Sequence, residues 1–140
     1  MTITAADVRV GNLMTLDPVT VEPEAPVSEA EQLLKTYRVT GLPVVHNDEV
    51  VGVVSQSDLM VARSSDVIGQ HWDRLHVRHL MTAPAVTVHA TATVEWAARQ
   101  MLRRHIHRLV VLGDDGAPIG VVTPLDLLRA LIEDRIEVDA

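Results

Sequence analysis

The chain has 140 residues, which is enough for one compact domain or for two small halves that share a core. Hydrophobic residues make up 47% of the sequence and phenylalanine is absent. The formal net charge of −7 argues against DNA or RNA as the main partner, because binding to phosphate backbones requires a basic surface. The absence of cysteine excludes disulfides, thiolate nucleophiles and zinc–thiolate sites.

The N-terminal residues do not combine a basic segment with an apolar segment, as a secretory signal would. No apolar run approaches the roughly 18 residues that a membrane-spanning helix requires. We therefore expect a soluble, cytoplasmic protein with neither a membrane nor a nucleic acid as its partner.

An internal repeat organises the sequence. Segments of the first half recur in the second half at a spacing of 67 residues, which becomes 68 after one residue is inserted near Gly113. The repeated pairs are Leu13-Met14-Thr15 with Leu80-Met81-Thr82, Val19-Thr20-Val21 with Val86-Thr87-Val88, and Gly52-Val53-Val54 with Gly120-Val121-Val122. Matches in a single register, with one gap at a turn, indicate a duplicated module.

This register sets the boundaries of four predicted parts. They are copy one at residues 8–62, a connector at 63–74, copy two at 75–131 and a C-terminal tail at 132–140. Trp72 in the connector is either an anchor for an interface or a cap on the core. The tail alternates charged residues with a few apolar ones, so it is either the end of a helix or a segment that docks on a partner.

Each copy predicts elements in the order β-α-β-β-α. In copy one these are a strand at 19–21, a helix with Pro26 as its first residue, strands at 42–45 and 50–54 around a polar turn, and a second helix. In copy two they are a strand at 86–88, a helix with a stripe from Val94 to Leu102, strands at 109–112 and 119–122, and a second helix. Strands this short cannot bury both faces alone, so we expect an α+β fold with sheet packed against sheet and helices outside.

The two strand-to-helix junctions, Ser55–Asp58 and Thr123–Asp126, share a hydroxyl-x-x-carboxylate pattern. A structural interpretation makes the hydroxyl residue the N-cap and Pro124 the first helical residue, with the carboxylate in the first turn, a cap worth roughly 1 kcal/mol. A functional interpretation uses the same geometry, since a helix N-terminus and a hydroxyl bind phosphate and a carboxylate accepts ribose hydroxyls. Gly52 and Gly120 precede the junctions and indicate that another backbone passes close to these strands.

Several motifs together resemble a tandem pair of CBS (cystathionine β-synthase) domains, also called a Bateman module. They are the repeat, the Leu-Met-Thr opening, Gly41-Leu42-Pro43-Val44-Val45, His107-Arg108-Leu109-Val110-Val111 and both Gly-Val-Val-[Ser/Thr]-x-x-Asp endings. The resemblance extends from about Val8 to Leu131 and leaves no further domain, which is typical of a stand-alone module. Copy two is similar to the last repeat of the gamma subunit of AMP-activated protein kinase. The resemblance implies two repeats packed about a pseudo-twofold axis, with two clefts that each use residues of both copies.

The resemblance also assigns residues to the two clefts. In the first, Asp126 would hold a ribose, Thr123 would lie near the phosphate, and the remaining residues would be Val19, Val39, Thr40, His107, Arg108 and Val121. In the second, Asp58 and Ser55 would take the same roles, with Arg38, Val53, Val86, Ile106 and again His107. Copy one has Thr40-Gly41 where copy two has His107-Arg108. A phosphorylated ligand is therefore expected at the cleft of Thr123 and Asp126.

The run Arg103–Arg108 is the dense basic segment of this acidic chain. Arg103 and Arg104 are either cations that favour the negative end of a helix or ligand contacts. Arg108 is predicted to contact phosphate, since it lies at the entrance to a strand and a guanidinium matches phosphate geometry. The histidine pairs of the chain lack a carboxylate or thiolate at a recognisable spacing, so we expect no metal site.

Three classes of function compete. An enzyme is not expected, nor is a catalytic cofactor, because no nucleophile–base pair, metal set or glycine-rich phosphate loop is visible. The two retained aspartates and hydroxyls favour a regulatory, energy-sensing module of bacterial type that binds AMP, ADP, ATP, S-adenosylmethionine or NAD and signals to a protein partner in trans. The alternative is a ligand-free dimeric scaffold. The resemblance further implies a homodimer formed through the helices.

Overall fold

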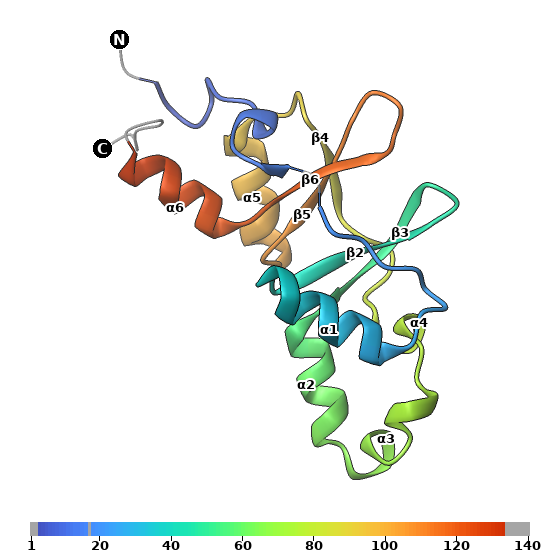
Figure 1. Cartoon of the computed structure of the whole chain (residues 1–140). Helices are drawn as coiled ribbons and strands as arrows, with labels where there is room; N and C mark the ends of the chain where they lie inside the picture. The colour runs from blue at the N-terminus through green and yellow to red at the C-terminus, as the bar shows by residue number, and fades with distance from the viewer. Residues whose placement is uncertain (1–2, 17, 134–140) are drawn as a thin grey trace. The chain divides into compact units, whose positions relative to one another are not determined.

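The computed structural model describes residues 3–16 and 18–133, so residues 134–140 of the predicted tail lie outside the described part (Figure 1). The fold is α+β, with two small sheets and helices, as predicted. The chain divides into two compact units, one formed by residues 1–18 and 86–140 and the other by residues 19–85. We call them the copy-two unit and the copy-one unit, after the copy that supplies most of each. Packing of the copies about a pseudo-twofold axis stays a prediction.

The copy-one unit is built around one antiparallel hairpin. Its elements are α1 (Val27–Tyr37), β2 (Gly41–His46), β3 (Glu49–Ser55), α2 (Gln56–Ser64), α3 (Asp66–Gly69), the 3-10 turn η2 (Trp72–Arg74) and α4 (Val77–Leu80). Single bridges extend the hairpin on both sides, where Val21 pairs in parallel with Val44 and Thr82 pairs in antiparallel fashion with Val53. Trp72 packs against the core of this unit, which favours its interpretation as a core cap.

The copy-two unit contains a sheet in the strand order β1-β6-β5-β4 (Figure 1). Its elements are the 3-10 turn η1 (Val10–Asn12), β1 (Thr15–Leu16), β4 (Thr87–His89), α5 (Val94–Arg104), β5 (Leu109–Leu112), β6 (Pro118–Val122) and α6 (Pro124–Ile132). β1 and β5 both pair with β6 in antiparallel fashion, and β4 pairs in parallel with β5. The bridges of the copy-one unit repeat this order on a smaller scale, because Thr82 and Val21 match Thr15 and Val88 at the spacing of 67.

Each compact unit takes its opening segment from the other copy of the sequence. Residues 1–18 precede copy one in the chain but belong to the copy-two unit, where β1 pairs with β6. Likewise, the segment before Val86 belongs to the copy-one unit, where Thr82 pairs with Val53. The boundaries 8–62 and 75–131 stay a prediction for the repeats of the sequence, whereas the spatial units exchange their opening segments.

The helical stripes predicted from the sequence face the cores. In α1 the buried side chains are Val27, Ala30 and Leu34, and in α5 they are Val94, Ala97 and Met101. Both sets have the spacing of one helix face. Tyr37 in the first stripe and Leu102 in the second were expected on these faces but are instead 56% and 76% exposed. The predicted turn after β2 is also confirmed, since Asn47 and Asp48 both have positive φ, as a two-residue hairpin of type I′ requires.

Two details of copy one differ from the prediction. Within the expected strand 19–21, Val21 alone forms a bridge. The next position that could extend this parallel ladder is Pro23, which has no N–H, whereas its counterpart Ala90 donates to the Leu112 carbonyl. Pro26 was expected as the first helical residue but is the N-cap, with an extended ψ of 148°, and α1 begins at Val27.

The expectation that a backbone passes close to Gly52 and Gly120 is confirmed. A Cβ atom at Gly120 would lie 2.8 Å from the carbonyl oxygen of Thr15 and 2.5 Å from the sulfur of Met14. A Cβ atom at Gly52 would lie 2.8 Å from the carbonyl oxygen of Thr82. In each unit, the Leu-Met-Thr segment of one copy thus crosses the glycine of the other copy at a separation that excludes a side chain.

We predict that Gly120→Ala lowers the free energy of unfolding by about 1–3 kcal/mol, because the added methyl group must displace backbone as well as a methionine side chain. Gly113→Ala is the matched control, since its Cβ would meet a methyl group of Ile119 at 3.2 Å. Chemical denaturation of the purified variants measures both values. Equal losses for the two variants would contradict the close approach at Gly120.

Candidate functional site

The junction at Thr123 holds a buried carboxylate. Asp126 lies in the first turn of α6, and its side chain is 4% exposed. Its Oδ2 accepts hydrogen bonds from the Thr123 backbone N–H at 2.8 Å and from the Thr123 hydroxyl at 3.2 Å. Thr123 is the N-cap and Pro124 the first helical residue, as predicted. The capping interpretation therefore holds, and the same geometry leaves a hydroxyl and a carboxylate together at a helix N-terminus.

The junction at Ser55 has the same capping arrangement, but its carboxylate is more exposed. Ser55 caps α2, and its hydroxyl oxygen accepts from the Asp58 N–H at 3.1 Å. In return, Asp58 Oδ2 accepts from the Ser55 N–H at 2.8 Å. The Asp58 side chain is partly exposed, whereas Asp126 is buried. The two copies thus share a capping box and differ in what surrounds its carboxylate.

The other predicted site residues of the copy-two unit lie around the strands β5 and β6. Val121 pairs with Thr15, and the Val86 carbonyl accepts from the Val110 N–H. Ile106 and His107 line a groove of about 430 Å³, together with residues of α5 and the start of α6. Arg108 directly precedes β5, as predicted.

The predicted site residues of the copy-one unit lie in several of its elements, some beside the Ser55 junction and others against the core of the unit. Val53 pairs with Thr82, and the Thr40 carbonyl accepts from the Gln56 N–H at the start of α2. Arg38 is the C-cap of α1 in the left-handed conformation. Val19 and Val39 pack against the core of this unit. Each predicted cleft combines residues of both compact units, so its full composition stays a prediction.

Two residues that contact Asp126 were missed in the sequence. The Thr15 hydroxyl and the Arg129 guanidinium both donate to Asp126 Oδ1, each at 3.4 Å. The spacing of three residues between Asp126 and Arg129 on one helix is a signal that could have been used. Thr15 lies 111 residues away in the chain, and only the exchange of opening segments brings it to this site.

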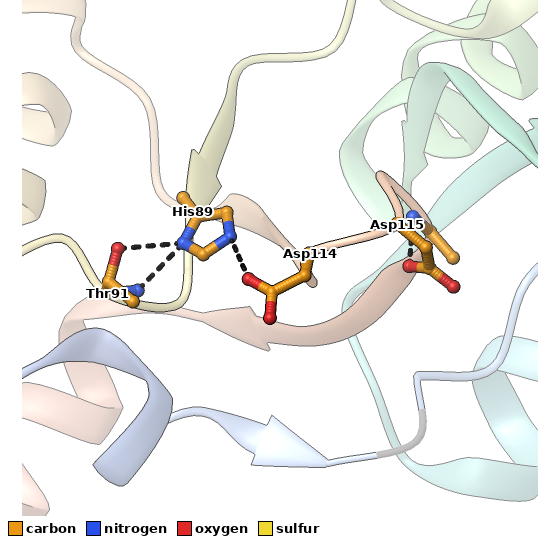
Figure 2. Close-up of polar contacts among 5 residues, drawn as sticks. His89, Thr91, Asp114 and Asp115 are labelled. Carbon is orange, nitrogen blue, oxygen red and sulfur yellow. Dashed lines mark hydrogen bonds and ion pairs between the residues drawn. The ribbon is translucent and has the colours of Figure 1, made fainter.

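A hydroxyl–imidazole–carboxylate array lies elsewhere in the copy-two unit (Figure 2). His89 Nδ1 lies 2.8 Å from the Thr91 hydroxyl and accepts from the Thr91 N–H at 3.1 Å, and Nε2 lies 3.0 Å from Asp114 Oδ1. A nucleophilic site also requires free donors for an oxyanion. The nearby α5 offers none in its first turn, because the N–H groups of residues 94–97 bond to Val8, Ala5, Thr93 Oγ1 and the Thr93 carbonyl. We interpret the array as structural, because its hydrogen bonds join the loop after β4 to the hairpin turn before β6.

Residues 3–16 and 18–133 contain no group of three or more histidine or acidic side chains placed to hold a metal ion. Within the same residues, no helix is long and apolar enough to cross a membrane.

The comparison with known families decides the assignment. The profile of the CBS domain matches the chain twice, at residues 10–65 and 77–133. The chain belongs to the CBS domain family. The two matches form a tandem CBS pair, and both contain the hydroxyl-x-x-carboxylate junctions described above.

Curated relatives of this CBS pair are much longer proteins. An inosine-5'-monophosphate dehydrogenase from Korarchaeum cryptofilum is 31% identical over 119 residues, which cover 85% of this chain and 23% of the dehydrogenase. An uncharacterised protein from Methanocaldococcus jannaschii is 27% identical over 125 residues, 40% of its length. The CBS pair thus spans less than half the length of either relative.

Solved structures resemble the CBS pair over nearly its whole length. The crystal structure of CBSX2 in complex with AMP is 32% identical, with a TM-score of 0.77, and the match covers 91% of this chain and 98% of CBSX2. A second structure, of CBSX2 from Arabidopsis thaliana, matches equally well. The CBS domain of a bacterial CNNM/CorC family Mg²⁺ transporter in complex with ATP shares the fold, at 22% identity and a TM-score of 0.78.

We predict that Asp126→Ala destabilises the CBS pair by about 2 kcal/mol and Asp58→Ala by about 1 kcal/mol. The larger loss arises because Asp126 is buried and accepts from four donors, among them the Thr15 hydroxyl on a distant segment. Urea denaturation of both variants checks the order of the two effects. A larger loss for Asp58→Ala would show that the four contacts of Asp126 do not hold the folded state.

Proposed function

We propose that this CBS pair is a regulatory module that binds adenine nucleotides at its two junctions and passes the binding signal to a protein partner in trans. The observation that carries the proposal is the repeated junction, which places a hydroxyl, a carboxylate and a helix N-terminus together in both units. The likeness to CBSX2, which was crystallised with AMP, supports adenine nucleotides as the ligand class.

Each junction supplies two kinds of ligand contact. The carboxylates of Asp58 and Asp126 accept hydrogen bonds from ribose hydroxyls, which are donors of matching chemistry. The hydroxyls of Ser55 and Thr123 and the positive ends of the α2 and α6 helix dipoles favour an anionic group. Adenine would lie on the apolar side chains of Val53 and Val121, which precede the junctions in β3 and β6.

The residues that the family resemblance assigns from the opposite copy complete the proposed sites. At the Asp126 site they are Val19, Val39 and Thr40, with His107 and Arg108 of the same copy nearby. At the Asp58 site they are Val86, Ile106 and His107, with Arg38 of the same copy. Arg108 is the proposed phosphate contact, because its planar guanidinium can donate two parallel hydrogen bonds.

The proposed role is regulatory and cytoplasmic, and it involves no catalysis and no catalytic cofactor. A carboxylate that accepts ribose hydroxyls contributes binding rather than bond formation. The dehydrogenase activity of the longer relatives is not part of the proposal, because the CBS pair spans 23% of the Korarchaeum cryptofilum enzyme. A module that reports AMP relative to ATP would act as an energy sensor.

We predict that AMP raises the melting temperature of the CBS pair. At about 100 times its dissociation constant, a ligand specific for the folded state adds roughly 2.7 kcal/mol of stability. Differential scanning fluorimetry with AMP, ADP, ATP, NAD and S-adenosylmethionine compares the ligands, and isothermal titration calorimetry measures their affinities. Asp58→Ala and Asp126→Ala should each remove one site, whereas the control Asp115→Ala, in an exposed hairpin turn, should bind as the unaltered protein does.

The outcome against the proposal is a melting temperature that none of the five ligands changes. A protein that is folded and dimeric but binds none of them would support the alternative function, a ligand-free scaffold. Unchanged AMP binding in both Asp58→Ala and Asp126→Ala would instead show that the junctions are not the binding sites.

We further propose that the CBS pair forms a homodimer through its helices. Large apolar side chains are exposed on α5 and α6, namely Trp96, Leu102, Leu125, Leu128 and Ile132. Leu125, Leu128 and Ile132 recur at the spacing of one helix face, so they form a continuous apolar stripe on α6. Burial of this stripe against a second copy removes apolar surface from water, which favours association.

We predict that Leu128→Glu combined with Leu102→Glu converts the dimer to a monomer, because two charges are placed in the apolar contact. Sedimentation velocity at micromolar concentration measures the change. Val67→Glu is the control, since Val67 is also 71% exposed but lies on α3. A monomeric unaltered protein, or a dimer that persists in the double variant, would contradict an interface on α5 and α6.

A further inference from the structure

The two junctions differ in one charged neighbour of the carboxylate. Arg129 follows Asp126 on α6, and its Nη1 lies 3.4 Å from Asp126 Oδ1. The side chain of Arg129 is 59% exposed, so part of its guanidinium also faces solvent. The matching position of copy one, at the spacing of 68, is Val61, an apolar residue that is 70% exposed on α2.

On α2, no basic side chain takes the place of Arg129. The nearest one along α2 is Arg63, which donates to Glu31 at 3.0 Å and lies over the Trp72 ring at 4.2 Å. The Asp58 carboxylate accepts from the Ser55 N–H at 2.8 Å. At the position that Arg129 occupies in α6, α2 therefore gives its carboxylate no guanidinium, whereas the carboxylate of Asp126 is paired with Arg129.

This difference matters for a nucleotide more than for a nucleoside. A ribose held by a carboxylate carries its 5'-phosphate only one sugar ring away, so the two negative charges repel each other. A guanidinium beside the carboxylate cancels its charge and attracts the phosphate. A nucleoside has no phosphate, and its affinity depends much less on this compensation.

We propose that Arg129 determines ligand charge selectivity, so that the Asp126 site accepts a phosphorylated nucleotide and the Asp58 site, with Val61 in the matching position, prefers a nucleoside without phosphate. The inference rests on the proposed function, because it assigns different ligands to the two proposed sites. It depends on contacts within each unit alone, since Thr15, Thr123, Asp126 and Arg129 all belong to the copy-two unit.

The test uses the full chain and two ligands that differ by a phosphate, AMP and adenosine. In an Asp58→Ala background, which leaves the Asp126 site, Arg129→Gln should weaken AMP binding about fivefold to tenfold by isothermal titration calorimetry and leave adenosine within about twofold. Arg129→Lys, which keeps the charge, should retain most of the AMP affinity. The matched control is Arg99→Gln, which removes an equally exposed arginine that pairs with Glu95 at 2.9 Å on α5.

The converse substitution tests the other copy. In an Asp126→Ala background, Val61→Arg should strengthen AMP binding about fivefold at the Asp58 site, with adenosine affinity unchanged. Equal losses of AMP and adenosine in Arg129→Gln would show that Arg129 only positions Asp126, and this result would overturn the inference. An unchanged AMP affinity in both variants would overturn it as well.

Failure of the proposed function has a different outcome. In that case the unaltered protein binds neither AMP nor adenosine, and the variants have no affinity to compare. If the unaltered protein binds AMP and the Arg129 and Arg99 variants lose the same affinity, the effect is one of net charge, and the specific role of Arg129 is refuted while nucleotide binding stands.

Discussion

The structure depends on the close crossing of two backbones at a glycine, which occurs once in each unit. Gly120 and Gly52 allow the Leu-Met-Thr segments to pass with carbonyl oxygens 2.8 Å from the place where a Cβ atom would lie. This crossing lets β1 pair with β6 and lets Thr82 pair with Val53. Because each segment comes from the other copy, a single copy of the repeat does not supply a complete unit.

The same crossing shapes one candidate site. It brings Thr15 to the start of α6, where its hydroxyl donates to the carboxylate of Asp126. The carboxylate thus serves two purposes in the fold, since it caps a helix and holds an exchanged segment, and in the proposed function it would also accept ribose hydroxyls. The two interpretations of the hydroxyl-x-x-carboxylate pattern are not alternatives for this reason. A helix N-terminus that needs acceptors and a ligand that needs a rigid acceptor are satisfied by one residue type at one position.

Much of the fold could be predicted because local chemistry determines it. The spacing of apolar residues predicted α1 and α5, the polar pair Asn47 and Asp48 predicted a tight hairpin, and the hydroxyl residues predicted both N-caps. The exchange of opening segments could not be predicted, because both Leu-Met-Thr segments match both glycine-containing strands equally well. Thr15 at the Asp126 site was missed for the same reason. Arg129 was missed because the basic run before β5 is the stronger sequence signal for a phosphate contact, although the spacing of three residues between Asp126 and Arg129 indicates a contact on one helix.

Because the chain is duplicated, equivalent positions of the two copies can be compared to find which residues the fold requires. Positions that agree between the copies, such as the glycines and the capping residues, are explained by the shared geometry of the two units. Positions that differ are not required by that geometry, since one copy folds without them. The position of Arg129, which is Val61 in copy one, differs in this way. Each of these residues lies about one helical turn after the aspartate of its own copy. The charge beside only one of the two carboxylates accompanies its burial, and it is also the difference on which the proposed ligand selectivity rests.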